Sequence, residues 1–255
     1  MTKLPQALLL AAATMVPGLV MAQAPAPAAS ESPHSFTGKA ALYSEYEYRG
    51  ISQTSEKPAL QLNLDYAHSS GFYLGTFLTN IKWLKDAASV GGFSTSANLE
   101  WDIYGGYKKE IAKDLTLDVG YLRYEYPSSG AFNPKPNTDE IYAGLTYGIF
   151  NVKYSYATGD TFGVANSKGS DFLEANIAYP VTEKITLTGH VGHQKYKNNN
   201  SLSYTVWKAG GVYDFGGGLT AGGYVKGTDA AEALYTVKGK DWGKNRLVAF
   251  VAYSF

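Results

Sequence analysis

The sequence contains no cysteine, which excludes a disulfide framework and any metal site built on thiolates. Charge is scarce and balanced. Charged residues make up 17% of the 255, and the formal net charge of zero argues against a nucleic-acid-binding surface. After residue 22, no apolar run approaches the ~18 residues of a membrane-spanning helix. The chain is instead rich in tyrosine (21) and glycine (28).

The N-terminus has the order of a secretory signal peptide. Lys3 precedes a short apolar run, a Pro17-Gly18 break and the small residue Ala22. We predict a signal peptide over residues 1–22, because a cut after Ala24 would place Pro25 next to the cleaved bond. The Pro- and Ala-rich residues 23–35 are predicted to be a disordered lead-in. Residues 36–255 then form a single β domain.

The last ten residues alternate with the period of a β-strand. Leu247, Ala249, Val251, Tyr253 and Phe255 are all apolar and share one face. A terminal aromatic residue with a second one two positions earlier resembles the signal by which bacterial outer-membrane β-barrels are recognised for assembly. We therefore expect Tyr253 and Phe255 to be an assembly signal, although a strand of a soluble sandwich would share the alternation.

Eleven further segments carry strand signals, and their connections alternate strictly between long and short. The predicted strands are residues 37–49, 60–66, 72–83, 98–107, 115–125, 140–147, 152–157, 173–179, 185–196, 204–215, 219–227 and 246–255. A soluble sandwich has no reason to sort its loops in this way. The pattern predicts an all-β fold: a transmembrane antiparallel up-and-down β-barrel of about 12 strands, with short periplasmic turns and longer extracellular loops.

Two strands have a less regular pattern. In residues 72–83 we expect Tyr73, Phe77, Ile81 and Trp83 to face outward, with Asn80 and Lys82 inward. In residues 115–125 the alternation places Arg123 and Glu125 on the outer face. That strand therefore either bulges or has already risen above the membrane.

Residues 36–107 also resemble the TorF-type family of proposed porins. The resemblance is carried by Tyr48-Arg-Gly-Ile-Ser-Gln53, Lys57-Pro-Ala-Leu-Gln61, Asp65-Tyr66, Gly71-Phe-Tyr-Leu-Gly75, Asn80 and Glu100-Trp-Asp-Ile-Tyr-Gly-Gly-Tyr107. It implies a proteobacterial outer-membrane barrel with a pore role. It implies no substrate and no catalytic residue.

The charges predicted to face the lumen are partly sorted by strand. The first six strands contribute Glu45, Glu47, Asp65, Glu100, Asp102, Asp118 and Glu140, with Arg49 and Lys82 as the cations. The last six contribute Lys153, Lys208, Lys226 and Arg246, with Glu174 as the anion. Opposed walls of this kind either create a transverse field across a narrow water-filled channel or pair with one another and fill the lumen.

From this set we expect nine residues to govern solute selectivity. They are Glu45, Glu47, Arg49, Asp65, Glu100, Asp102, Lys208, Lys226 and Arg246. Barrel closure pairs the first strand with the last, so Arg246 is expected near the first strand's carboxylates. Lys226 is expected to be a free lumen cation.

Enzyme chemistry has little support in the sequence. His190 and His193 are three residues apart, so on one strand they face opposite sides and cannot share a metal. His193 has no serine two residues away to act as a nucleophile, although a partner on an adjacent strand stays open.

We therefore expect an outer-membrane channel for passive diffusion of small polar or charged solutes, without metal, cofactor or nucleic acid. Its partners would be outer-membrane lipid and the barrel-assembly machinery. A structural or adhesive barrel, or an outer-membrane hydrolase, are the alternatives.

Overall fold

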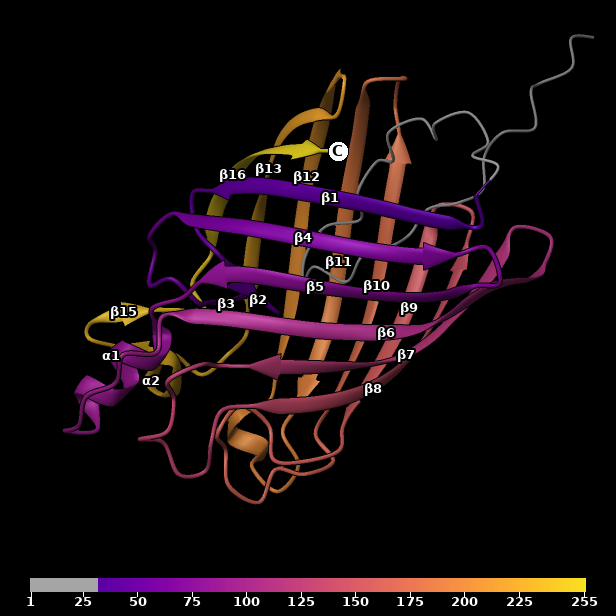
Figure 1. Ribbon diagram of the computed structural model, residues 1–255. Helices are drawn as coiled ribbons and strands as arrows, with labels where there is room; N and C mark the ends of the chain where they lie inside the picture. The colour runs from indigo at the N-terminus through magenta and orange to yellow at the C-terminus, as the bar shows by residue number, and fades with distance from the viewer. Residues whose placement is uncertain (1–31) are drawn as a thin grey trace, which may run out of the picture.

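The computed structural model describes residues 32–255, which form a closed antiparallel barrel of twelve strands (Figure 1). The barrel strands are β1 (His34–Tyr43), β4 (Ala59–His68), β5 (Phe72–Asn80), β6 (Leu99–Ala112), β7 (Leu115–Glu125), β8 (Thr138–Tyr147), β9 (Phe150–Ala157), β10 (Asp171–Pro180), β11 (Ile185–Lys195), β12 (Tyr204–Gly216), β13 (Leu219–Thr228) and β16 (Arg246–Ser254). Each pairs with its sequence neighbour, and β1 pairs with β16 to close the ring. The predicted twelve-strand fold is confirmed.

The connections alternate as predicted. Those at one end are residues 69–71, 113–114, 148–149, 181–184 and 217–218. Those at the other end are residues 44–58, 81–98, 126–137, 158–170, 196–203 and 229–245. The strand β1 begins and β16 ends at the short-turn end, where the C-terminus is marked in Figure 1. The predicted signal peptide and most of the predicted lead-in lie outside the described residues.

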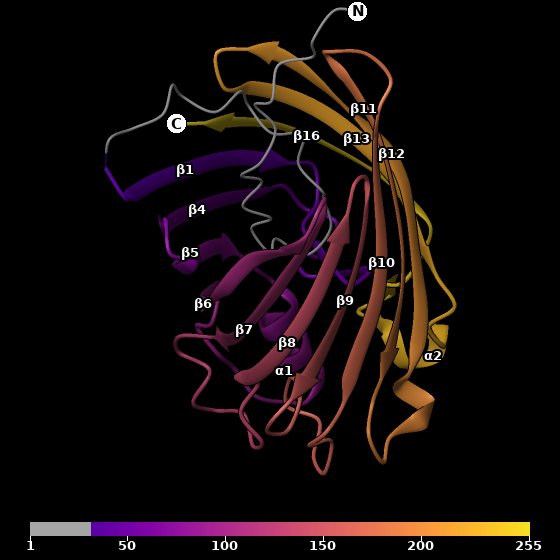
Figure 2. The ribbon, with the colours of Figure 1, turned by 90° about the vertical axis from the view of Figure 1, so that its right-hand side faces the viewer.

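The long connections contain short elements of their own. These are β2 (Glu47–Tyr48), β3 (Ile51–Ser52), α1 (Trp83–Val90), η1 (Asn200–Leu202), α2 (Glu232–Tyr235), β14 (Thr236–Val237) and β15 (Lys240–Asp241). Figure 2 shows α1 and α2 at the end of the barrel opposite the C-terminus. Within residues 32–255, no helix is both long and apolar enough to cross a bilayer.

Strand alternation sorts the side chains between an apolar outer face and a polar interior. On β4, Leu60 and Leu64 are exposed, while Gln61 and Asn63 are buried. On β16, Leu247 and Val251 are likewise exposed. Exposed aromatic residues ring the short-turn end: Phe36, Phe72, Tyr147, Phe150, Tyr179, Phe215, Tyr253 and Phe255. This is the surface expected of a barrel whose outer face contacts an apolar medium.

The predicted facing of the third barrel strand is wrong. On β5 it is Phe72 and Leu74 that face outward, with exposures of 62% and 57%, whereas Phe77 is fully buried. Tyr73 also points inward and donates a hydrogen bond to Asp118 at 2.6 Å. Both faces of this strand carry large apolar residues, so alternation alone cannot choose between them.

The end of that strand was also predicted too far along the chain. After Asn80 the chain leaves the barrel, so Ile81 is buried beside the strand end and Trp83 begins α1. Lys82 forms an ion pair with Asp86 of α1 and does not line the barrel. Asn80 is exposed and donates to the Pro58 carbonyl at 3.2 Å, so its predicted inward position is wrong too.

Inward aromatic rings lie against glycines on neighbouring strands. A Cβ built on Gly106 would lie 2.6 Å from the Tyr73 hydroxyl, and one on Gly75 would lie 2.4 Å from the Tyr104 ring. Glycine at these positions therefore lets the rings lie close to the wall. On the outer face, β7 continues through Arg123 without a bulge toward β8, and Arg123 bonds Asp139 at 2.9 Å.

Candidate functional site: a hairpin inside the barrel

The connection between β1 and β4 folds into the barrel as a hairpin, which we call the inner hairpin (residues 44–58). Its strands β2 and β3 pair with each other and not with the barrel. Residues 45–55 are all buried, whereas barrel strands alternate between buried and exposed positions. Eleven consecutive buried residues require contacts on every side, so this segment crosses the interior at the long-loop end.

Sequence alternation extended the first strand too far, because its predicted range of residues 37–49 runs into the inner hairpin. The pairing of β1 with both neighbours ends at Tyr43. Beyond it the Tyr/Glu alternation continues, but there it reflects two faces of the hairpin, both enclosed by the barrel. Glu45, Glu47 and Arg49 therefore belong to the hairpin and not to the wall.

The tip of the hairpin is the Arg49-Gly50 turn. Both residues have positive φ, 46° and 83°, as a two-residue turn between antiparallel strands requires. A Cβ on Gly50 would lie 2.5 Å from Thr228 Cγ2 and 2.6 Å from Val206 Cγ2. The tip thus touches β12 and β13, and only glycine satisfies both the turn and this close approach.

Arg49 connects the hairpin to strands β8, β10 and β11. Its guanidinium donates to both carboxylate oxygens of Glu140 on β8, at 3.0 and 2.7 Å, and to Gln194 Oε1 on β11 at 2.7 Å. Its Cζ lies 4.3 Å from the Phe172 ring centroid on β10. The Arg49 and Glu140 side chains are 6% and 3% exposed, so the pair is almost fully enclosed.

Glu47 connects the hairpin to the basic side. Its Oε1 lies 2.5 Å from Lys208 Nζ on β12 and accepts a hydrogen bond from the Tyr224 hydroxyl at 3.1 Å. Lys226 on β13 donates to the carbonyl oxygens of Gly50 and Trp242, at 2.8 and 3.0 Å. Lys226 is therefore not the free lumen cation that we expected. Lys226 binds the hairpin backbone because the tip of the hairpin extends as far as β13.

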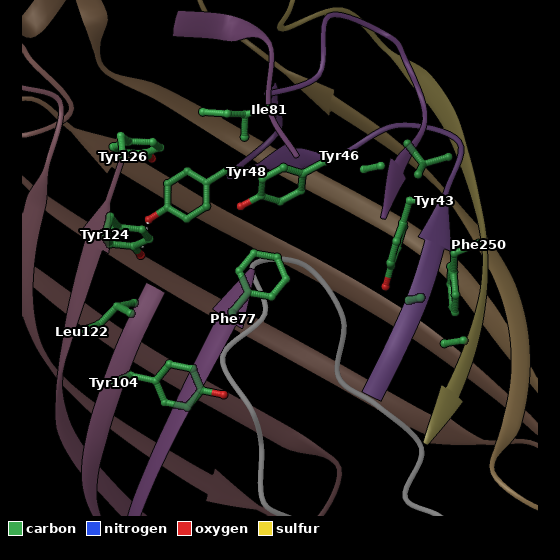
Figure 3. Close-up of a cluster of buried hydrophobic side chains, with 14 of the residues drawn as sticks. Tyr43, Tyr46, Tyr48, Phe77, Ile81, Tyr104, Leu122, Tyr124, Tyr126 and Phe250 are labelled. Atoms are coloured by element: carbon green, nitrogen blue, oxygen red, sulfur yellow. Dashed lines mark hydrogen bonds between the residues drawn. The ribbon is translucent and has the colours of Figure 1, made fainter. Parts of the chain in front are cut away.

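Aromatic residues fill the space between the hairpin and strands β5 to β7. In Figure 3 the Tyr46 ring lies beside Phe77, and Tyr48 lies beside Tyr124. The Tyr46 and Phe77 centroids are 5.9 Å apart, and the Tyr48 and Tyr124 hydroxyls are hydrogen-bonded at 2.6 Å. The Tyr46 hydroxyl also donates to Glu100. The hairpin thus contacts the wall through rings as well as ion pairs.

Residues 51–58, the half of the inner hairpin that leads from its tip back to β4, are held at the long-loop end. Arg246 at the start of β16 donates to Glu56 Oε1 at 2.6 Å, and its Nε lies 4.0 Å from Glu45 Oε2. Arg246 therefore lies near carboxylates, as predicted. These carboxylates belong to the inner hairpin that follows β1 and not to β1 itself. Lys240 donates to the Ser55 carbonyl at 2.8 Å.

Acid should weaken the Glu56 contact. The hydrogen bond from Arg246 holds the pKa of the Glu56 carboxyl below its ordinary 4.5, with Lys240 and Lys244 adding to the effect. A lowered folded-state pKa stabilises the protein above 4.5, and this stabilisation is lost as the pH falls below that value. We expect Glu56→Gln to remove ~0.5–1 kcal/mol near neutral pH and almost nothing near pH 3, because the pair is partly exposed. Urea unfolding at both pH values measures it, and an equal loss at both would contradict it.

The remaining predicted selectivity residues lie on the barrel wall. Asp65 accepts a hydrogen bond from Tyr104 at 2.5 Å, on the short-turn side of the hairpin. Asp102 is buried beside Glu100 on β6, and its Oδ1 has no hydrogen-bond partner among the described residues. The nine predicted residues thus divide among the hairpin, the wall that it contacts and the wall beyond it.

Sequence reasoning missed the wall groups that receive the hairpin. Gln194, Phe172 and Tyr224 carry no net charge at neutral pH, so they are not among the predicted lumen charges. The signal that could have exposed the hairpin is the Arg49-Gly50 dipeptide, because a glycine after a long alternating run is typical of a turn.

The two histidines of β11 point to opposite faces of the barrel wall. His190 points inward, 2.7 Å from Asn176 Oδ1, whereas His193 is exposed on the outer face, as the spacing predicted. Among residues 32–255, no group of three His, Cys, Asp or Glu side chains is placed to hold a metal ion. The Thr205 hydroxyl on the adjacent strand lies 3.1 Å from His193 Nδ1. Among residues 32–255, no carboxylate is hydrogen-bonded to the His193 imidazole.

Comparisons with known proteins agree with this architecture. The fold is similar to a KdgM porin solved in complex with disordered oligogalacturonate (TM-score 0.51, 11% identity, 86% of this chain and 98% of that one). It is also similar to a NanC porin (TM-score 0.53, 11% identity, 87% and 99%). Identities this low establish a shared fold only. A search of curated proteins found no match. The model of the Gcw_chp family, described as bacterial proteins of unknown function, matches residues 27–255, so the chain belongs to that family.

Proposed function

We propose that this chain is a porin-like channel of the bacterial outer membrane, through which small polar or charged solutes diffuse passively without a cofactor. The observation that carries the proposal is the charged interior of a closed barrel, crossed by a hairpin whose Arg49 pairs with Glu140 on β8 and whose Glu47 pairs with Lys208 on β12. Buried charges in this number are costly in a purely structural core, and they suit a polar path.

The outer face supports the membrane location. Leucine and valine side chains cover the strands, and the exposed aromatic ring at the short-turn end matches an interfacial girdle. The two solved relatives are porins, and the resemblance of residues 36–107 to the TorF-type family agrees. With short turns in the periplasm, the inner hairpin would enter the barrel from the outside of the cell.

Selectivity would be set where the inner hairpin crosses the barrel. The groups there are Glu45, Glu47, Arg49, Glu100, Asp102, Lys208, Lys226 and Arg246, with Asp65 beyond them. Because hairpin and wall groups neutralise each other in pairs, we expect a narrow path with low conductance and modest ion preference.

Single-channel recording tests this proposal. The purified protein in a planar bilayer should produce discrete, ohmic current steps, and reconstituted liposomes should swell in small polar solutes. The Asp65→Asn and Lys208→Met variants should shift the reversal potential in opposite directions. A heat-modifiable, correctly inserted barrel that conducts no ions in any variant would contradict the channel function.

A structural or adhesive barrel is the second candidate, favoured by apolar side chains exposed in the long loops. Val90 at the end of α1 is 67% exposed, and Leu234 in α2 is 49% exposed. Binding of purified protein to cells or matrix that is lost in Val90→Ser and Leu234→Ser, without any channel activity, would favour it over the porin. Hydrolysis is disfavoured because the His193–Thr205 pair lacks an orienting carboxylate among the described residues.

The assembly signal is tested by deleting Phe255. Its backbone pairs with Gly38 at 2.8 and 2.9 Å, and its ring lies over that glycine on the outer face. Because no lumen group is touched, we expect slow or failed insertion and periplasmic degradation, with unchanged conductance in any barrel that forms. Fractionation with heat-modifiability on gels measures it, and wild-type amounts of inserted barrel would sink the idea.

A further inference from the structure

The contacts of Arg49 have the form of a ligand site in the barrel wall. Glu140 receives both sides of the guanidinium fork, Gln194 accepts a further hydrogen bond at 2.7 Å, and the Phe172 ring stacks on the Cζ at 4.3 Å. These three wall residues come from β8, β11 and β10, and each is buried. Tyr48, 4.8 Å from the same Cζ, is the hairpin's own contribution.

This combination of groups recognises a guanidinium better than an ammonium. A planar fork matches the two oxygens of a carboxylate and stacks on an aromatic ring, whereas an ammonium makes only point contacts. The Tyr124 hydroxyl, 3.4 Å from Glu140 Oε2, adds a donor to the carboxylate. The negative charge of the Glu140 carboxylate makes the site unfavourable for anions.

The wall part of the site remains when the inner hairpin moves away. Glu140 would then be a buried carboxylate without a counter-charge, since Arg49 is its only ion-pair partner within residues 32–255. Such a state is unfavourable unless another cation replaces Arg49. We propose that the Glu140–Gln194–Phe172 site binds the guanidinium group of a solute, which displaces Arg49 and thereby releases the inner hairpin from this part of the wall.

Competition with a tethered group would keep the solute's affinity low. A side chain on a short tether acts at an effective concentration in the millimolar range, so the solute must exceed that range or bind more tightly than Arg49 does. Weak binding suits transport, because a solute held tightly would not leave. The inference rests on the proposed channel only for this transport step, and the binding site itself can be tested without conduction.

Melting experiments with the full chain in detergent test the binding site, with methylguanidinium as the probe and methylammonium as the matched ion. In Arg49→Ala the site is vacant, so we expect methylguanidinium to raise the Tm at millimolar concentrations. Wild type should need at least tenfold more, and Arg49→Ala with Glu140→Gln should not respond. Arg123→Ala, which removes a cation from the outer face and touches no part of the inner hairpin, is the control and should behave as wild type. If Arg49→Ala does not refold, Arg49→Gln takes its place.

The inference is overturned if methylguanidinium and methylammonium act alike on the vacant site, or if the double variant responds as strongly as the single one. In planar bilayers, methylguanidinium should also lengthen wild-type openings where methylammonium does not, and equal effects count against displacement. Failure of every variant to conduct would reject the channel proposal, while the melting result would still decide the binding site.

Discussion

Replacing the inner hairpin (residues 44–58) with a two-residue Asn-Gly turn is expected to raise the single-channel conductance roughly threefold or more, because the eleven buried residues 45–55 no longer cross the lumen. The replacement is compatible with the barrel, since Tyr43 and Ala59 are register partners on β1 and β4. A type I′ turn of Asn-Gly joins such partners without disturbing either strand.

The matched control shortens a different long connection. Residues 91–94, after α1, are all exposed, and their deletion leaves the inner hairpin in place. We expect this variant to conduct as wild type. Conductance that is equal in both variants, in barrels that are heat-modifiable, would mean that the inner hairpin does not limit the path.

The second large effect is on stability. Glu140→Ala leaves the Arg49 guanidinium buried with only Gln194 as a hydrogen-bonding partner on the wall, so we expect a loss of about 3–5 kcal/mol in the free energy of unfolding. Exposed pairs behave differently. Removing Asp139, the partially exposed partner of Arg123 on the outer face, should cost ~1 kcal/mol or less.

A double variant separates loss of the pair from loss of packing. Arg49→Met combined with Glu140→Met removes both charges, so it should be more stable than Glu140→Ala alone. Urea unfolding of the barrel in lipid vesicles measures all of these values. If the loss of unfolding free energy in the double variant equals the sum of the losses in Arg49→Met and Glu140→Met, Arg49 and Glu140 act independently.

Strand positions were predictable because they depend on local alternation. On β4, leucines alternate with polar residues along the strand, and the structure places the two kinds on opposite faces as expected. The same rule failed on β5, where Phe72 and Phe77 compete for the outer face. The choice between them depends on contacts with Tyr46, which lies far away in the sequence.

The lumen charges show the same limit. Alternation correctly identified Glu140 and Lys208 as inward-facing, but their partners Arg49 and Glu47 come from a segment that alternation assigned to the wall. The wall charges Glu140 and Lys208 pair with the inner hairpin and not directly with each other across the lumen. The hairpin supplies a cation to Glu140 and a carboxylate to Lys208.

The sequence by itself determined the number of strands, the alternation of long and short connections, and the apolar outer face, because each follows from residues close together in the chain. Only the tertiary structure decided that residues 44–58 turn into the barrel. An extended hairpin satisfies its own backbone hydrogen bonds either inside or outside. Its position depends on contacts with strands that are far away in the sequence. Tyr224 is 177 residues from its partner Glu47, and Arg246 is 190 residues from its partner Glu56.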